Sequence, residues 1–402
     1  MCRNVCTSGN KKKYKCIKIN ISISRQIGVK MKILITGSDG FIAKNLIVEL
    51  KNRGYNNLLL VNRETAEDTI QNYAAECDVL FHLAGVNRPE KEEEYLSGNV
   101  EFTEKLITYL KKNPKKVHIV FSSSIQADRE NVYGVSKRKA EILLQNYVSL
   151  GKATLSIYRL PNVFGKWCKP DYNSVVATFC YHIARGETIQ IHNPSAKIEL
   201  IYIDDVIGTW IQDMELHEEI QEQYPKLETS FLLTVGELAH LLYQFADCRI
   251  NFSLPNLSNE AEKKLYSTYL SYLESEQLKY PLKMNEDNRG SFTEFLKTEY
   301  SGQVSVNMIK PGIVKGNHWH HTKVEKFLVV KGNALIKLRH IVTGKKVEYK
   351  VSGERLEVVD IPVGYTHSIA NIGSEDLVTI MWANEIFDKE KPDTYFEEVD
   401  RS

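Results

Sequence analysis

Short hydrophobic runs alternate with longer amphipathic segments along the first part of the chain, beginning near Met31. The short runs favour β-strands, and the longer segments, in which hydrophobic residues recur with helical spacing, favour α-helices. In chain order the predicted elements are Lys32–Thr36, Phe41–Arg53, Leu58–Val61, Val79–His82, Val117–Phe121, Tyr133–Val148 and Thr154–Arg159. Alternation of this kind is typical of βαβ units and a parallel sheet. We therefore predict an α/β domain over residues 31–255.

The pattern changes twice after Val206. It first becomes more helical, and a polar stretch without a strand pattern, residues 256–284, is predicted to be a connector. Farther on, short hydrophobic runs follow one another closely, with Gly, Pro and Asn between them. These predicted strands are Val304–Ile309, Lys326–Val330, Ala334–Ile341, Leu356–Ile361 and Leu377–Trp382. Many short strands separated by turns indicate a sandwich or barrel, so we predict an all-β domain over residues 285–398.

Composition adds one feature, a basic segment at the start. The chain has 402 residues, of which 43% are hydrophobic and 26% charged, so it can bury an ordinary core. Its net charge is +1, yet residues 1–30 carry eight Lys and Arg and no acidic residue. This segment lacks the hydrophobic core of a secretory signal, so we expect a leader or a disordered tail. The mildly acidic remainder argues against nucleic-acid binding.

Cysteine usage and hydropathy indicate the compartment. Three of the seven cysteines lie in residues 1–30, and the other four form no paired motif. No stretch has the roughly 18 consecutive apolar residues of a membrane span. We expect a soluble, reduced, cytoplasmic protein without a membrane span.

A glycine-rich turn joins the first predicted strand to the first predicted helix, the arrangement in which dinucleotides bind. Gly37 permits the tight turn, Gly40 lets a pyrophosphate approach the backbone, and Ala43 keeps helix and strand close. Amides at the helix N-terminus would hold the pyrophosphate. The cofactor contacts expected here are Gly37, Asp39, Gly40, Phe41 and Ile42. Taken alone, the motif could also be a plain strand-to-helix turn.

The end of the second predicted strand indicates which cofactor binds. NAD enzymes usually place a carboxylate there to hold the ribose 2′-hydroxyl, whereas this chain has Arg63, followed by Glu64. A guanidinium suits a 2′-phosphate, so NADP(H) is favoured over NAD. The alternative is a solvent-facing arginine without a role in binding.

Two further motifs carry a family resemblance. The chain contains His82-Leu83-Ala84-Gly85 and, on a predicted helix, Tyr133-Gly134-Val135-Ser136-Lys137. With the glycine-rich turn, they resemble those of extended short-chain dehydrogenases/reductases, over roughly residues 31–250. The resemblance implies a doubly wound Rossmann domain, with Leu83, Ala84 and Gly85 at the cofactor.

The catalytic residues of that family can be assigned to positions in this chain. Tyr133 and Lys137 lie on one helical face, because residues four apart do so. Lys137 would hold the nicotinamide ribose and lower the pKa of Tyr133, whose phenol would pass a proton during hydride transfer. The third member is a serine of Ser122-Ser123-Ser124, and Ser124 is preferred, although only nine positions separate it from Tyr133.

A second stretch resembles the nucleotide-sugar site of the extended members. It reads Tyr158-Arg159-Leu160-Pro161-Asn162-Val163-Phe164-Gly165. Asn162 and Arg159 are therefore candidate contacts to a nucleotide-diphosphate sugar. For Arg159 a structural ion pair is the alternative.

The predicted β domain contains two histidine motifs. The first runs from Gly312 through His318-Trp319-His320 and Glu325 to Gly332, and the second from Pro362 through His367 to Asn371. They resemble the two motifs of the cupins, which are jelly-roll barrels. Histidines at alternate strand positions point to the same side. With Glu325 and His367 they form a set suited to a divalent metal, for which zinc is the first choice. A structural role for these histidines is the alternative.

The sequences Asp287-Asn288-Arg289-Gly290-Ser291-Phe292-Thr293-Glu294 and Lys315-Gly316-Asn317-His318 are similar to elements of deoxysugar 3,5-epimerase cupins. In those enzymes the corresponding histidine is a general base. His318 is therefore either a base or a ligand, and His320, Glu325 and His367 form the firmer metal set.

The order of the two domains resembles a family of bifunctional enzymes of capsular-polysaccharide synthesis, over residues 31–398. That resemblance implies C3 epimerisation of a UDP-linked 4-keto-6-deoxy-N-acetylhexosamine, followed by NADPH reduction at C4, in a homodimer. Two alternatives stay open: a reductase whose barrel only binds or dimerises, and a regulatory NADP(H) sensor without catalysis.

Overall fold

The computed structural model describes residues 31–216, 223–227 and 229–401. These residues form two compact units that divide between Ala239 and His240, except that Ile183–Arg185 belongs with the second unit. The predicted leader, residues 1–30, lies outside the described residues, and so do its three cysteines.

A five-stranded parallel sheet forms the centre of the first unit, in the order β2-β1-β3-β4-β5. Its strands are β1 (Ile33–Thr36), β2 (Leu58–Val61), β3 (Val79–His82), β4 (Val117–Ser124) and β5 (Ala153–Leu160). Strands β1, β3 and β4 are buried and almost entirely hydrophobic up to their carboxyl ends, because helices cover both faces of the sheet.

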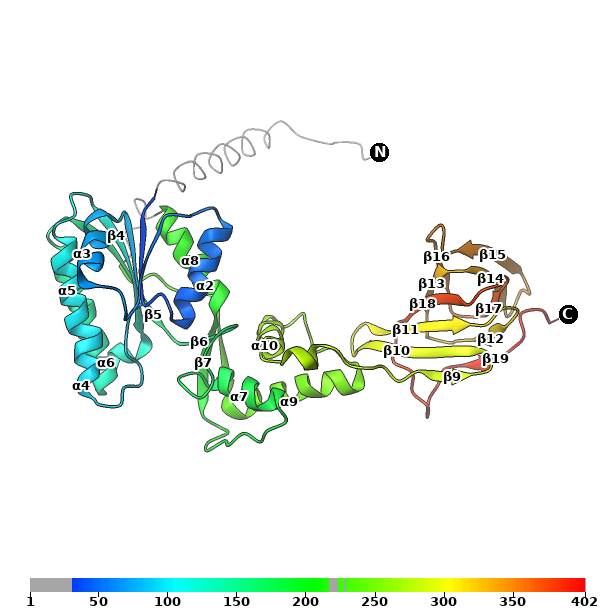
Figure 1. Cartoon of the computed structure of the whole chain (residues 1–402). Helices are drawn as coiled ribbons and strands as arrows, with labels where there is room; N and C mark the ends of the chain where they lie inside the picture. The colour runs from blue at the N-terminus through cyan, green and yellow to red at the C-terminus, as the bar shows by residue number, and fades with distance from the viewer. Residues whose placement is uncertain (1–30, 217–222, 228, 402) are drawn as a thin grey trace. The chain divides into compact units, whose positions relative to one another are not determined.

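The covering helices lie in two layers (Figure 1). One hydrophobic cluster joins the sheet to α2 (Phe41–Asn52) and α8 (Ile203–Leu216), and includes Trp210. The other joins the opposite face to α3 (Glu67–Glu76), α5 (Phe102–Leu110) and α6 (Val132–Val148). This is the predicted doubly wound α/β fold.

Irregular helical pieces and a small sheet complete the first unit. The helical pieces are α4 (Glu93–Leu96), the π-helix η1 (Ser97–Glu101), the 3-10 helix η2 (Ile125–Asp128) and α7 (Val175–Ala184), whose last residues belong to the second unit. The small sheet has the order β6-β7-β8 and consists of β6 (Asn162–Phe164), β7 (Lys197–Tyr202) and β8 (Ser230–Thr234).

The division of the chain falls inside α9 (Val235–Asn251), before the predicted limit at residue 255. Most of α9 belongs to the second unit because its Phe245 packs against Tyr266 and Tyr269 of α10 (Glu260–Leu270). The predicted connector therefore contains a helix with its own packing partner, followed by the 3-10 helix η3 (Ser275–Leu278).

Two antiparallel sheets follow in the second unit, with the orders β16-β13-β18-β11-β10-β9 and β15-β14-β17-β12-β19. A hydrophobic core between them includes Phe327, Ile336 and Ile369. The strands are β9 (Asn285–Asp287), β10 (Gly290–Thr298), β11 (Gly302–Ile309), β12 (Val314–Trp319), β13 (Glu325–Lys331), β14 (Asn333–His340), β15 (Lys346–Ser352), β16 (Val358–Ile361), β17 (Tyr365–Asn371), β18 (Leu377–Ala383) and β19 (Tyr395–Phe396). The predicted all-β domain is confirmed.

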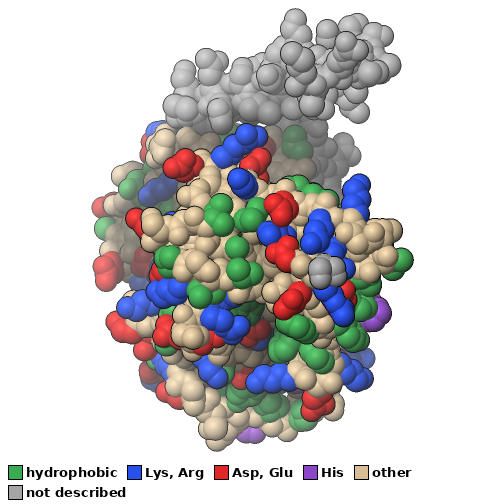
Figure 2. Space-filling model, turned by 90° about the vertical axis from the view of Figure 1, so that its right-hand side faces the viewer, with side chains coloured by type: hydrophobic (Ala, Val, Ile, Leu, Met, Phe, Trp, Pro, Cys, Tyr) green, Lys and Arg blue, Asp and Glu red, His purple; other side chains and the backbone are tan. Residues whose placement is uncertain are grey.

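Surface charge, hydropathy and the cysteines add three observations. Figure 2 shows acidic and basic side chains interspersed over the face that it presents. Among the helices of the described residues, none is long and apolar enough to cross a membrane. Within the same residues no disulfide joins Cys77, Cys168, Cys180 or Cys248.

Candidate functional sites

The glycine-rich turn forms a close contact with the loop after β3. Gly37 has a φ of +69°, and a Cβ there would lie 2.9 Å from the backbone nitrogen of Ala84. The Thr36 hydroxyl accepts hydrogen bonds from the amides of Leu83 and Ala84, both at 3.1 Å. Both loops were predicted to contact the cofactor, and the fold brings them together at the carboxyl ends of β1 and β3.

The start of α2 and the end of β2 complete this region. Gly40 is the N-cap of α2, and Phe41 and Ile42 lie half-buried in its first turn. Asp39 accepts a hydrogen bond from the Asn62 side-chain amide at 3.0 Å. Arg63 is exposed, and no ion pair to it is found within the described part of the chain. Its guanidinium is thus available to an anionic group beside the turn.

Ser124, Tyr133 and Lys137 meet at the end of β4. This strand extends beyond the predicted Phe121 because its pairing with β5 continues to Ser124 and Leu160. The Ser124 hydroxyl lies close enough to the Tyr133 phenol to lower its pKa, and it accepts a hydrogen bond from the amide of Gln126 at 3.2 Å. Lys137 is buried and donates to the Ser122 carbonyl at 2.6 Å. Of the three serines, Ser124 is the one that affects the pKa of Tyr133.

The pKa of Tyr133 differs from the prediction. Burial raises it to about 12, and the Ser124 hydrogen bond, which acts in the opposite direction, only partly offsets this effect. Lys137 was expected to lower this pKa, but it is not among the groups that shift the pKa of Tyr133, and burial has the largest effect. Burial also lowers the pKa of Lys137 to about 8, against the charge of Glu141, which raises it.

An open pocket of about 440 Å³ adjoins Tyr133. Its walls also include Asn87, Gln126 and Asn173. Asn173 belongs to the loop between β6 and α7 and was not singled out from the sequence, because nothing in its neighbourhood along the chain marks it as a pocket residue. Buried Asn99 was missed as well, although its side chain binds both backbone groups of Val86, at 2.8 and 3.2 Å.

The two predicted sugar contacts differ in their surroundings. Asn162 is exposed and donates to the Glu199 carbonyl at 3.0 Å. Arg159 forms two hydrogen bonds to Glu141, at 3.0 and 2.7 Å, and one to Asp128 at 2.6 Å. Arg159 thus forms the ion pair that was the alternative interpretation, while its contact with a sugar stays a prediction.

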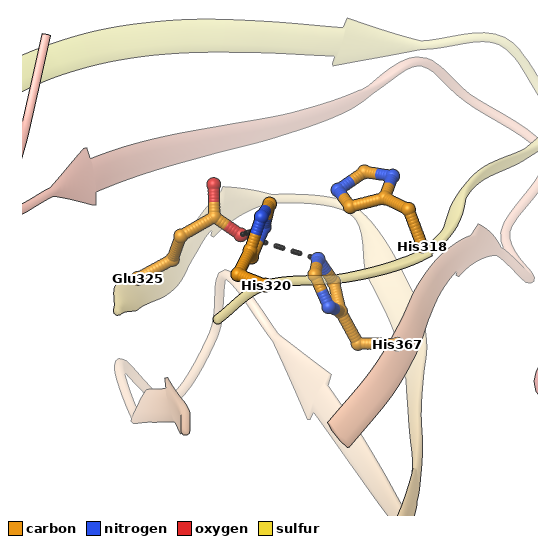
Figure 3. Close-up of side chains that lie close together, drawn as sticks. All are labelled: His318, His320, Glu325 and His367. Atoms are coloured by element: carbon orange, nitrogen blue, oxygen red, sulfur yellow. Dashed lines mark ion pairs between the residues drawn. The ribbon is translucent and has the colours of Figure 1, made fainter. Parts of the chain in front are cut away.

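In the barrel, four predicted residues come together from three strands (Figure 3). His318 lies in β12 with His320 just beyond its end, Glu325 begins β13, and His367 lies in β17. One ligand atom of each lies within 4.8 Å of the others. Glu325 Oε2 is 3.1 Å from His367 Nε2 and 3.5 Å from His320 Nε2.

This group contains buried polar atoms that lack hydrogen bonds. Among the described residues His320 Nε2, Glu325 Oε2 and His367 Nε2 have no partner of suitable geometry. Burial would raise the pKa of Glu325, but the neighbouring imidazoles outweigh it and lower the pKa. Burial and the nearby His367 lower the pKa of His318 to about 4. Buried atoms without partners, aimed at one another, fit a divalent cation.

Asp393 holds the same group from the C-terminal segment. Its backbone carbonyl lies 2.5 Å from His320 Nδ1, which leaves Nε2 of that ring directed at Glu325. Its carboxylate accepts from the amides of His321 and Thr322, at 3.0 and 2.9 Å. Partners of this kind fix the orientation of a metal-binding imidazole. Asp393 was not predicted from the sequence, because it lies far from the histidine motif along the chain.

Comparison with known proteins agrees with this two-part arrangement. Residues 33–223 match the NAD dependent epimerase/dehydratase family, and residues 285–395 match the polysaccharide biosynthesis C-terminal domain. A UDP-glucose 4-epimerase from Thermotoga maritima shares 20% identity over 62% of this chain and all of its own, with a TM-score of 0.51, which shows the fold alone.

Two relatives span nearly the whole chain. A UDP-2-acetamido-2,6-beta-L-arabino-hexul-4-ose reductase from Pseudomonas aeruginosa is 44% identical over 91% of this chain and 98% of its own length. The crystal structure of the capsular polysaccharide assembling protein CapF from Staphylococcus aureus is 51% identical over 92% of this chain and all of its own, with a TM-score of 0.85. The chain therefore belongs to the protein family that includes CapF and this hexulose reductase.

Proposed function

We propose that this protein is a bifunctional nucleotide-sugar enzyme of capsule or surface polysaccharide synthesis. Its barrel epimerises C3 of a UDP-2-acetamido-2,6-dideoxy-4-hexulose, and its first domain then reduces C4 with NADPH. The observation that carries the reductase part is the meeting of Ser124, Tyr133 and Lys137 at the edge of the sheet where Gly37 and Ala84 also lie. The similarity to the Pseudomonas hexulose reductase supports the substrate class.

In the reduction, Tyr133 acts as the proton donor. Bound NADPH supplies a hydride to the carbonyl carbon C4. The Tyr133 phenol, whose raised pKa keeps it protonated at neutral pH, gives its proton to the C4 oxygen. Ser124 orients the same oxygen, and the Lys137 ammonium holds the cofactor ribose. A ketone, a hydride and a proton thus yield the alcohol.

Arg63 favours NADPH over NADH in this proposal. Its exposed guanidinium follows β2, where it can pair with a ribose 2′-phosphate. The carboxylate of Asp39 is engaged by Asn62 instead.

In the barrel, His320, Glu325 and His367 would hold a divalent cation, with zinc as the first choice. A cation there supplies Lewis acidity that polarises a C4 carbonyl and acidifies the proton on C3. His318 accepts that proton on one face of the ring, and return of a proton to the opposite face inverts C3. The product after reduction is a UDP-N-acetyl-6-deoxy-L-talosamine, a precursor of UDP-N-acetyl-L-fucosamine.

A second candidate is a reductase whose barrel only binds sugar or dimerises. It is weakened by the three buried ligand atoms without hydrogen-bond partners, since a purely structural barrel has no need of them. A cytoplasmic location and a homodimer remain predictions.

The test uses the full chain with a UDP-4-keto-6-deoxy-N-acetylhexosamine in deuterated water, with and without NADPH. Deuterium at C3 before NADPH is added, followed by loss of nicotinamide absorbance on its addition, is the expected result. NADPH consumption without exchange would reduce the barrel to a binding module. The absence of both signals would contradict the proposal as a whole.

A variant separates the two activities. His318→Ala should stop exchange at C3 while reduction of an already epimerised ketosugar continues. His321→Ala, at the neighbouring histidine outside the ligand group, is the control and should leave exchange intact. Exchange that survives in His318→Ala would contradict the role of His318.

A further inference from the structure

The end of β4 is fastened to α6 at three successive residues. The Ser122 carbonyl accepts from Lys137 Nζ at 2.6 Å, and the Ser123 hydroxyl donates to Glu141 Oε1 at 2.5 Å. Ser124 lies close enough to Tyr133 to lower its pKa. The three helix partners are four residues apart and so share one face of α6. Two of these partners belong to the proposed catalytic group, and the third, Glu141, has no role in it.

Glu141 is a buried carboxylate with an extensive set of partners. Its side chain is almost fully buried, and besides Ser123 it accepts two hydrogen bonds from Arg159, at 3.0 and 2.7 Å. Arg159 is the register neighbour of Ser123 on the adjacent parallel strand. A charge so buried is tolerated only when its hydrogen bonds are met. Glu141 therefore fixes the position of α6 relative to β4 and β5.

Arg159 extends this contact to the short connection between Ser124 and Tyr133. Its third hydrogen bond, 2.6 Å long, goes to Asp128 in η2. The connection also packs tightly against the first turn of α6, since a Cβ on Gly134 would lie 2.1 Å from the Gln126 carbonyl oxygen. One guanidinium thus joins the helix, the strand and the connection that together determine where Tyr133 lies.

We infer that Glu141, Arg159 and Asp128 form a clamp that positions Tyr133 and Lys137 against Ser124, with Glu141 and Arg159 as positioning residues of the reductase. The inference rests on the proposed C4 reduction. It also gives Arg159 a role other than contact with the sugar. The clamp acts on the geometry of proton transfer, where a displacement of about 1 Å can lower a rate about 100-fold.

The experiment compares Glu141→Gln with the wild type in NADPH-dependent reduction of the 4-ketosugar. We expect kcat to fall by about 10- to 100-fold with little change in KM or in the Kd for NADPH. The high-pH limb of the rate profile should also move to lower pH, because the Glu141 charge supports the ammonium form of Lys137.

The control is Asp213→Asn, which removes another carboxylate that is also almost fully buried. Asp213 accepts from the Tyr158 hydroxyl at 3.0 Å and lies 3.7 Å from His118, at the opposite end of β4. This variant should lower Tm with an unchanged pH profile. If Glu141→Gln behaves in the same way, the carboxylate is merely structural and the inference is wrong.

Asp128→Asn covers the case in which Glu141→Gln does not fold. Asp128 is exposed, so its loss leaves no buried charge without a partner, and a smaller fall in kcat, about 3-fold, is expected with an unchanged Tm. An unchanged kcat in this variant would overturn the clamp. A wild-type protein that reduces no ketosugar would instead refute the proposed function, which keeps the two failures apart.

Discussion

Glu325 Oε2 and His367 Nε2 lie 3.1 Å apart inside the barrel, and within the described residues neither atom has a hydrogen-bond partner of suitable geometry. Burying two polar atoms without hydrogen bonds costs free energy, unless a third group such as a cation interacts with both. This pair is the main observation behind the divalent cation site that we propose for the barrel.

Metal content tests that role. His367→Ala should lower the affinity for a divalent metal by at least about 10- to 100-fold, because loss of a direct ligand costs no less than loss of an outer partner. Metal analysis and chelator competition on the full chain provide the measurement. His340→Ala, a histidine in β14 outside the ligand group, should keep the wild-type metal content. Equal metal content in the two variants would contradict the site.

Loss of the Tyr133 hydroxyl tests the proton donor. Tyr133→Phe should lower kcat for ketosugar reduction by about 100- to 10,000-fold, the range for a general acid, while NADPH still binds. Steady-state rates and a fluorescence titration with NADPH give the two numbers. Tyr147→Phe, at a buried tyrosine later in the same helix, is expected to reduce substrate at nearly the wild-type rate. A Tyr133→Phe enzyme that retains most of its rate would exclude Tyr133 as the donor.

The rate of reduction should depend on the charge of Lys137. Its pKa is lowered to about 8 by burial, so the ammonium form prevails below that pH and is lost above it. Because the ammonium form is the active one in our proposal, kcat should decline as the pH rises through about 8. Lys137→Arg keeps its charge throughout, so any activity it retains should not decline there. A wild-type profile that is flat across this region would contradict the prediction.

Cofactor preference tests Arg63. Arg63→Glu should lower the ratio of kcat/KM for NADPH to that for NADH by about 10- to 100-fold, the equivalent of one charged hydrogen bond to a 2′-phosphate. Lys112→Glu makes the same change of charge at an exposed position outside the described sites and should leave the ratio unchanged. If both variants change the ratio equally, the effect comes from the change in overall charge, and the proposed contact of Arg63 with the 2′-phosphate is wrong.

The hydrophobic pattern alone determined much of the fold. Strands β2 and β3 have the predicted bounds, and α6 begins one residue before the predicted start. These elements were predictable because β2 and β3 are short hydrophobic runs and the buried positions of α6 recur with a helical period. Strand β15 was not predicted, since its residues are mostly exposed and its Lys, Glu and Tyr positions interrupt any hydrophobic run.

The sequence by itself also determined those parts of the sites that are local along the chain. Tyr133 and Lys137 are one helical turn apart, and His318, His320 and Glu325 lie in one strand-turn-strand segment, so their spacing predicts their proximity. Only the tertiary structure decided which serine meets Tyr133, that Arg159 pairs with Glu141, and that Asp393 orients His320. The physical reason is that these contacts join elements distant in sequence, and their geometry depends on how strands pair and helices pack, which no local pattern encodes.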